Sequence, residues 1–175
     1  MGENPFVERV RSYFGYLVED YGFSVAERRY DEKAFGNSLV RFRSAATDVT
    51  VVLDRGQVFV YLAPRPESSG HRLNMRDVVD YLAPEPHEPV YVFPEEWNDY
   101  WSMVDSQVRR LARVLERYCT PVLAGEFSKW EEIVEIIQKE SLDKYRRLTG
   151  KAPLTTDSGE IQRDVQEEMR RRRDQ

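Results

Sequence analysis

The residue types that most often perform catalysis or bind metals are sparse in this chain. Among 175 residues it has two histidines, His71 and His87, and a single cysteine, Cys119. Both histidines stand in segments flanked by Pro and Gly, and neither has a second histidine or a cysteine at the spacing of a zinc site. We therefore expect exposed loop histidines, a buried structural thiol, no metal ligands and no catalytic residues.

Motifs for phosphate binding and for serine hydrolases are also missing from the sequence. Gly56 and Gly70 stand alone, with no Gly-Lys-Ser/Thr after them, and there is no G-x-S-x-G segment. Carboxylates gather where helices are expected to begin, as at Glu131 and Glu132, and there they favour the helix dipole. We interpret the chain as not an enzyme and as needing no cofactor. A small enzyme with a carboxylate-only site is the third alternative.

Two groups of residues remain as candidates for binding. The first, called here the acidic–aromatic group, consists of Glu95, Glu96, Trp97, Asp99, Tyr100 and Trp101. Tryptophan and tyrosine anchor many protein interfaces, and the neighbouring carboxylates favour a basic protein as the partner. In the alternative interpretation, the aromatic rings face the core and the acids face water.

The second group, called here the arginine–aromatic group, lies on the polar face of a predicted sheet and consists of Arg41, Arg43, Phe59 and Tyr61. Aromatic rings beside arginines stack on nucleic-acid bases or hold acidic groups. The alternative is that later helices cover this face, with the arginine stems packed beneath them.

The sheet is predicted from the alternation of apolar and polar residues between Asn37 and Pro64, with a sharp hairpin at Asp54-Arg55-Gly56-Gln57. With a first strand beginning at Phe23, short links favour a four-stranded antiparallel meander over residues 23–63. Helices are then needed to cover its apolar face.

Apolar residues at helical spacing predict helices over residues 5–21, 74–82, 95–119 and 129–149. The fold class is therefore α+β, a four-stranded antiparallel meander sheet packed by helices, with a helical C-terminal half. We predict a single α+β domain over residues 1–150 and a marginal helical tail over 151–175, where the apolar stripe is one residue wide.

Charge and hydropathy narrow the range of partners. The formal net charge of −5 argues against a dedicated nucleic-acid binder, which needs a basic excess. No apolar run approaches the roughly 20 residues that span a bilayer, and no leader pattern begins the sequence. We expect a cytoplasmic protein with no membrane partner. The oligomeric state is left open.

Three further segments carry a likeness to known proteins: Tyr21-Gly22-Phe23, the hairpin from Val51 to Val58, and Gly125-Glu126-Phe127-Ser128-Lys129-Trp130. In this order of elements the chain resembles small uncharacterised bacterial proteins of the immunity type, associated with polymorphic toxin systems. The likeness covers roughly the first 150 residues, and it has no catalytic residues to carry over.

The leading hypothesis is a non-enzymatic protein-binding module, an immunity- or antitoxin-like inhibitor that covers a partner's functional surface. The acidic–aromatic group would supply its anchors. The alternative is a nucleic-acid-associated accessory protein that uses the sheet face and the C-terminal arginines, Arg170 to Arg173.

Overall fold

The computed structural model describes residues 4–31, 37–66, 72–83, 86–92 and 99–150. The chain divides into two compact units, residues 1–127 (unit 1) and 128–175 (unit 2), and each is described by itself. This division concerns contacts within the chain, so the single domain predicted over residues 1–150 stays a prediction. The tail predicted over 151–175 lies outside the described residues.

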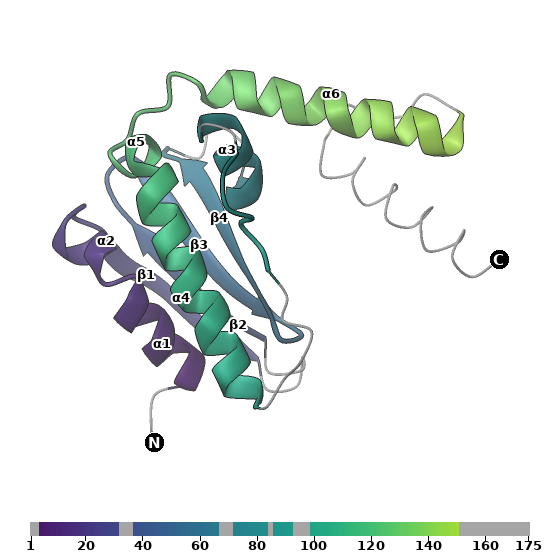
Figure 1. Cartoon of the computed structure of the whole chain (residues 1–175). Coiled ribbons are helices and arrows are strands. Elements are labelled where there is room, and N and C mark those ends of the chain that lie inside the picture. Colours follow the sequence, from purple (N-terminus) through teal and green to yellow (C-terminus); the bar gives the residue numbers. More distant parts are fainter. Residues whose placement is uncertain (1–3, 32–36, 67–71, 84–85, 93–98, 151–175) are drawn as a thin grey trace. The chain divides into compact units, whose positions relative to one another are not determined.

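The sheet of unit 1 is an antiparallel meander in the order β1-β2-β3-β4-β5 (Figure 1). Its strands are β1 (Ser24–Asp31), β2 (Asn37–Arg43), β3 (Thr47–Asp54), β4 (Gln57–Pro64) and β5 (Leu73–Asn74). The α+β class and the antiparallel meander are confirmed. The short strand β5 was not predicted, because two residues are too few to show an alternating pattern.

The hairpin between β3 and β4 falls where the sequence predicts it. Asp54 pairs with Gln57, and the two residues between them, Arg55 and Gly56, have φ angles of 50° and 82°. A two-residue hairpin whose central residues both have positive φ matches the right-handed twist of the strands it joins.

The helices of unit 1 are α1 (Pro5–Tyr13), α2 (Tyr16–Glu19), α3 (Met75–Leu82), α4 (Tyr100–Tyr118) and α5 (Thr120–Leu123). The helix predicted over 5–21 is divided at Gly15, a residue that disfavours a helix interior. The helix predicted over 95–119 is observed from Tyr100, and residues 95–98 lie outside the described residues. In unit 2, α6 (Trp130–Thr149) ends at Gly150, which has a φ of 68°.

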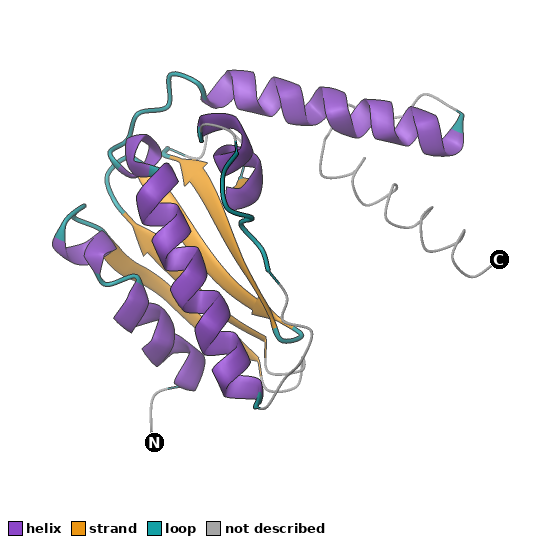
Figure 2. Cartoon of the chain, in the orientation of Figure 1, coloured by secondary structure: helices purple, strands orange, loops and turns teal. Residues whose placement is uncertain are grey.

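One face of the sheet forms the core of unit 1. Eight of its side chains are at most 1% exposed: Val40, Phe42, Val49, Val51, Leu53, Val58, Val60 and Leu62. Helices α1 and α4 lie across this face (Figure 2) and bury their own apolar residues, including Phe6, Val10 and Leu115. Burial of one such side chain stabilises the fold by roughly 1.5–3 kcal/mol, so the alternation decides which face the helices cover.

The edge of β4 that β5 leaves unpaired is closed by side chains. Strand β5 pairs only with Tyr61 and Leu62. Gln107 of α4 accepts a hydrogen bond from the Val58 N–H and donates one to the Gly56 carbonyl, both at 3.0 Å. The hydroxyl of Tyr91 accepts from the Val60 N–H at 3.4 Å. Because exposed strand edges invite pairing with other chains, these bonds protect β4.

Replacing Gln107 tests this closure. Gln107→Leu should lower the free energy of unfolding by about 2 kcal/mol or more, because it leaves the Val58 N–H and the Gly56 carbonyl buried without a partner. Urea denaturation followed by circular dichroism measures the loss. Ser106→Ala, an exposed position on the same helix, is the control and should change stability little. If both substitutions lowered the free energy of unfolding equally, Gln107 would not be closing the edge of β4.

Candidate binding surfaces

The second face of the sheet carries the arginine–aromatic group. In the strand register, Arg41 and Tyr61 both lie opposite Thr50 of β3, and Phe59 lies opposite Val52 in the neighbouring row. The helices of unit 1 lie on the other, core side of the sheet (Figure 2). The described helices of unit 1 therefore do not cover this face.

Each arginine of this group is paired with an acidic side chain. Arg41 lies 3.3 Å from the Glu27 carboxylate. Arg43 donates two hydrogen bonds, of 2.9 and 3.2 Å, to the two carboxylate oxygens of Asp48, and Arg65 lies 4.0 Å from the same carboxylate. Asp48 is only 5% exposed, and a buried carboxylate needs such partners to offset its desolvation. These pairs fix the arginines in place.

The aromatic members lie partly exposed beside apolar neighbours. The guanidinium of Arg72 stands 4.2 Å from the centre of the Tyr61 ring, and the Phe59 ring centroid is 5.6 Å from that of Tyr91. Leu39 and Val52 lie in the same row as Phe59. We call the partly exposed Val52, Phe59 and Tyr61 the apolar strip; Leu39 itself is only 8% exposed.

The acidic–aromatic group is only partly within the described residues. Glu95, Glu96 and Trp97 lie outside them, while the other members begin α4. Asp99 caps this helix and accepts a hydrogen bond of 2.7 Å from the Ser102 N–H, which lowers the pKa of the Asp99 carboxyl. Tyr100 is 43% exposed.

The third described member of that group, Trp101, is less accessible than Tyr100. The guanidinium of Arg9 of α1 stacks over the Trp101 ring, 5.1 Å from its centre. The Trp101 ring also contacts the Tyr100 ring edge to face. Trp101 therefore contributes to the contact between α1 and α4, which leaves Tyr100 as the described aromatic anchor of this group.

The prediction that His87 is an exposed loop histidine is wrong. Its side chain is 13% exposed, and its Nε2 lies 3.3 Å from the Asp80 carboxylate, while Nδ1 lies 3.1 Å from the Glu88 carbonyl oxygen. The segment 86–92, called the strap, packs against α4 and β4 instead of extending into solvent; within it, Val90 is 2% exposed. His71 lies outside the described residues.

Sequence reasoning missed the contacts that hold the strap. Its Glu88 carboxylate lies within reach of three arginines of α4, including Arg113 at 3.0 Å. Arg110, Arg113 and Arg117 are three and four residues apart, a spacing that puts them on one face of a helix. This spacing was the one sign in the sequence that they form a group. Their acidic partner comes from a proline-rich connector, where no periodicity indicates its position.

Cys119 is buried, as predicted. Burial raises the pKa of its thiol to about 12, so the nucleophilic thiolate is suppressed at neutral pH. Within the described ranges, no three or more His, Cys, Asp or Glu side chains come together as a metal site would require. No helix in the described part of the chain has the length and apolar character to cross a membrane.

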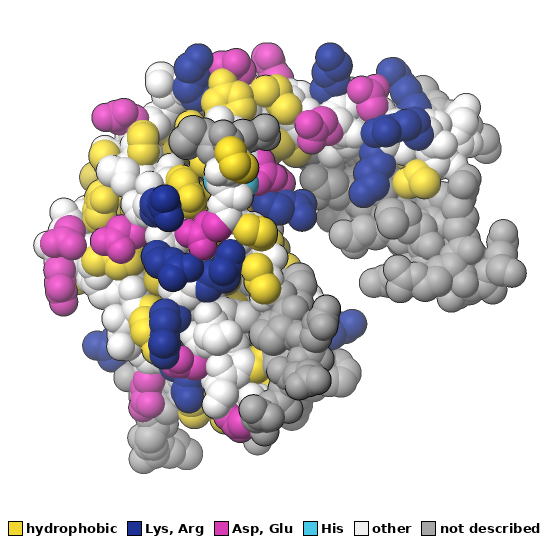
Figure 3. All heavy atoms as spheres, viewed as in Figure 1, with side chains coloured by type: hydrophobic (Ala, Val, Ile, Leu, Met, Phe, Trp, Pro, Cys, Tyr) yellow, Lys and Arg dark blue, Asp and Glu magenta, His cyan; other side chains and the backbone are white. Residues whose placement is uncertain are grey.

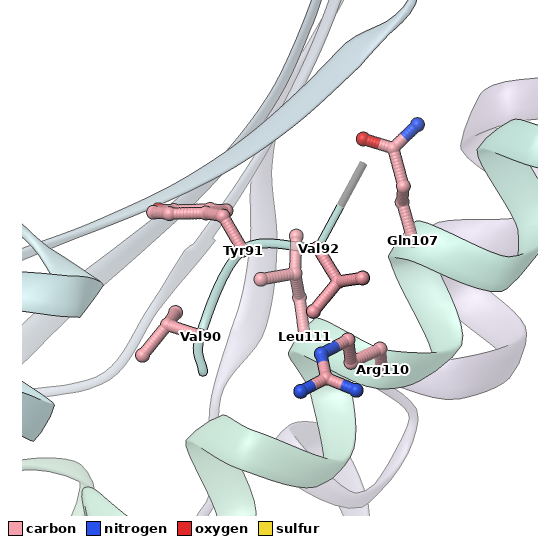
Figure 4. Close-up of a pocket in the computed structure, with 6 residues that line it drawn as sticks. All are labelled: Val90, Tyr91, Val92, Gln107, Arg110 and Leu111. Carbon is pink, nitrogen blue, oxygen red and sulfur yellow. The ribbon is translucent and has the colours of Figure 1, made fainter. Parts of the chain in front are cut away.

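A shallow hollow lies between the strap and α4 (Figure 4), with an empty volume of about 180 Å³. It is lined by Val90, Tyr91, Val92, Gln107, Arg110 and Leu111. Gln107 and Tyr91, which supply polar atoms to this lining, already use them on the edge of β4. We interpret the hollow as the boundary where the strap packs against α4, and not as a ligand site.

Comparison of the chain with protein-family models, with curated proteins and with solved structures found no match in any of the three. The function is therefore argued from the surfaces described above.

The capping role of Asp99 predicts a pH-dependent stability. Asp99→Ala should lower the urea midpoint at neutral pH, because the carboxylate no longer accepts the Ser102 N–H. Since the folded state lowers the pKa of Asp99, this stabilisation is present above the ordinary value of 3.8 and fades as the pH falls through the folded value. The two proteins should therefore converge in acid.

Glu116→Ala is the control for this experiment, because it removes an exposed carboxylate near the other end of α4, where the helix dipole does not favour one. It should cause no comparable loss at neutral pH. A difference between wild type and Asp99→Ala that stays constant from neutral to acidic pH would contradict the capping role.

Proposed function

We propose that this chain is a non-enzymatic protein-binding module that docks through the second face of its sheet. The observation that carries the proposal is the apolar strip, which lies on a face without helices in the described part of unit 1. An apolar centre with a polar rim is the usual anatomy of a protein interface. Aromatic residues near the centre of such a patch commonly supply much of the binding energy.

The rim of the strip favours an acidic partner. Five arginines lie on or beside this face, against three carboxylates of the described residues: Arg29, Arg41, Arg43, Arg65 and Arg72, against Glu27, Asp48 and Asp54. This excess is local, since the chain as a whole carries −5. A positive patch of this kind speeds association with a negative surface and disfavours basic partners. The acidic–aromatic group would favour the opposite charge, so the charge of the partner separates the two surfaces.

Three parts of the proposal rest on the sequence: the kind of partner, the absence of catalysis and the cytoplasmic location. The resemblance to immunity-type proteins favours a toxin-like partner whose functional surface is covered. The absence of catalytic motifs supports a role without catalysis. The lone cysteine, which permits no disulfide within the chain, fits a cytoplasmic location.

A nucleic-acid-associated role is the second candidate. It is favoured by one observation: Arg72 lies over the ring of Tyr61, which shares a cross-strand row with Arg41. Bases stack on the faces of aromatic rings. Because Arg72 already lies over the Tyr61 ring, stacking there requires that this arginine move, and we rank this role below protein binding.

The test is affinity capture of the tagged full chain from its native host, with the bound protein identified and its affinity then measured. Tyr61→Thr, which keeps a residue that favours strands, should weaken binding of a stoichiometric partner by at least about tenfold. Tyr100→Ala is the matched control on the acidic–aromatic group. Thermal melting checks that each variant is folded.

Loss of the partner on Tyr100→Ala, with Tyr61→Thr unaffected, would overturn the choice of surface. Recovery of nucleic acid instead, released steeply by salt and lost on Arg41→Ala with Arg43→Ala, would support the second candidate.

A further inference from the structure

A row of arginines on α4 converges on one carboxylate of the strap. Guanidinium nitrogens of Arg110, Arg113 and Arg117 lie 3.5, 3.0 and 3.6 Å from the carboxylate oxygens of Glu88. Arg110 is also held by the carbonyl oxygen of Pro89, at 3.1 Å from its Nε. Three positive charges therefore meet one negative charge, which leaves an excess of two at this cluster.

Of the three acidic residues that the structure describes nearby, two are engaged elsewhere. Asp105 pairs with Arg109 at 2.8 Å and with Arg9 of α1 at 3.5 Å. Glu116 is an exposed carboxylate on the same helix, adjacent to Arg117, and its charge offsets part of the excess at the row. Asp80 pairs with His87. Figure 3 shows the resulting dark blue patch over α4 on this face of the molecule.

The outer members of the row are accessible. The side chains of Arg113 and Arg117 are 63% and 65% exposed. Each guanidinium has five N–H donors in a planar fork that suits carboxylates, so a row of three has more donors than one carboxylate can accept. Further carboxylates can bind beside Glu88 without displacing it.

The spacing of the row fits an extended peptide. Arg113 and Arg117 are four residues apart on α4, a rise of about 6 Å along the helix. Alternate side chains of an extended chain point the same way and repeat at about 6.6 Å. Glu88 is an example within this chain: it reaches the row from the strap, which is neither helix nor strand.

We propose that the arginine row of α4 is a second docking site, which binds an extended acidic segment of a partner protein with Asp or Glu at alternate positions. Helix α4 lies on the core side of the sheet, opposite the apolar strip. The site therefore goes beyond the proposed function and does not depend on it.

The test is a titration of the full chain with a short fluorescent peptide of alternating glutamate and threonine, followed by anisotropy at one moderate salt concentration. Two probes are compared with it: a peptide of the same composition with its glutamates in one block, and a thymidine oligonucleotide of equal charge. The alternating peptide should bind the most tightly of the three.

Variants then locate the site. Arg113→Gln with Arg117→Gln should weaken binding of the alternating peptide by about tenfold. Arg146→Gln with Arg147→Gln removes the same charge from exposed positions of α6 and is the matched control. Glu88→Gln should strengthen binding, because it removes the negative charge that the peptide must approach.

The Glu88 result separates a docking site from a purely structural ion cluster, which would lose stability on Glu88→Gln and gain no affinity. Equal binding of the two peptides, equal or tighter binding of the oligonucleotide, or no effect of the Arg113 and Arg117 substitutions would overturn the proposal. Tyr61→Thr should leave peptide binding unchanged, so failure here is distinct from failure of the sheet-face proposal.

Discussion

Burial of one face of a single antiparallel sheet is the constraint on which the rest of unit 1 depends. Because the strands alternate, packing Val40, Phe42 and Val60 against the helices sends Arg41, Phe59 and Tyr61 to the other side. A shift of register by one residue would exchange the two faces. The same hydrophobic burial that stabilises the fold thus determines the residues of the proposed docking surface.

The closure of the β4 edge links this sheet to the second proposed site. Gln107 and Tyr91 bond to the strand where β5 ends, and Tyr91 belongs to the strap. Once Tyr91 is in place, the strap lies along α4 and Glu88 reaches the arginine row. The strap therefore takes part both in protecting the β4 edge and in the ion pairs with the arginine row.

Both proposed surfaces carry a local excess of positive charge, although the chain as a whole is negative. The chain carries −5 overall, yet arginines are in excess both around the apolar strip and on the outer side of α4. Because electrostatic attraction in salt solution falls off over about 8–10 Å, a partner responds to such local patches more than to the sum. Both surfaces favour an acidic partner, whereas the sequence alone pointed to a basic one through the acidic–aromatic group.

Local patterns in the sequence predicted the meander, the hairpin at Arg55-Gly56 and the end of α6 at Gly150, because each depends on residues close together in the chain. The break at Gly15 was not predicted, since the apolar residues keep their helical spacing on both sides of it. The burial of His87 was not predicted, since it requires Asp80 on α3. The role of Arg113 was missed for the same reason, since its partner Glu88 lies 25 residues away.

The same limit explains the candidate sites. The period of the strands was enough to put Arg41, Arg43, Phe59 and Tyr61 on one face, but it carries no information on whether helices lie over that face. For the acidic–aromatic group, the sequence did not separate Tyr100, which is exposed, from Trp101, which packs with Arg9.

The most direct test is a measurement of solvent access to the second sheet face in the full chain, by nuclear magnetic resonance with a neutral paramagnetic probe in solution. The ring signals of Phe59 and Tyr61 should broaden towards the extent seen for Tyr30, which is 51% exposed, while those of Phe42, at 1%, stay sharp. If Phe59 and Tyr61 are as protected as Phe42, another part of the chain or a second copy covers this face, and the proposed docking surface is wrong.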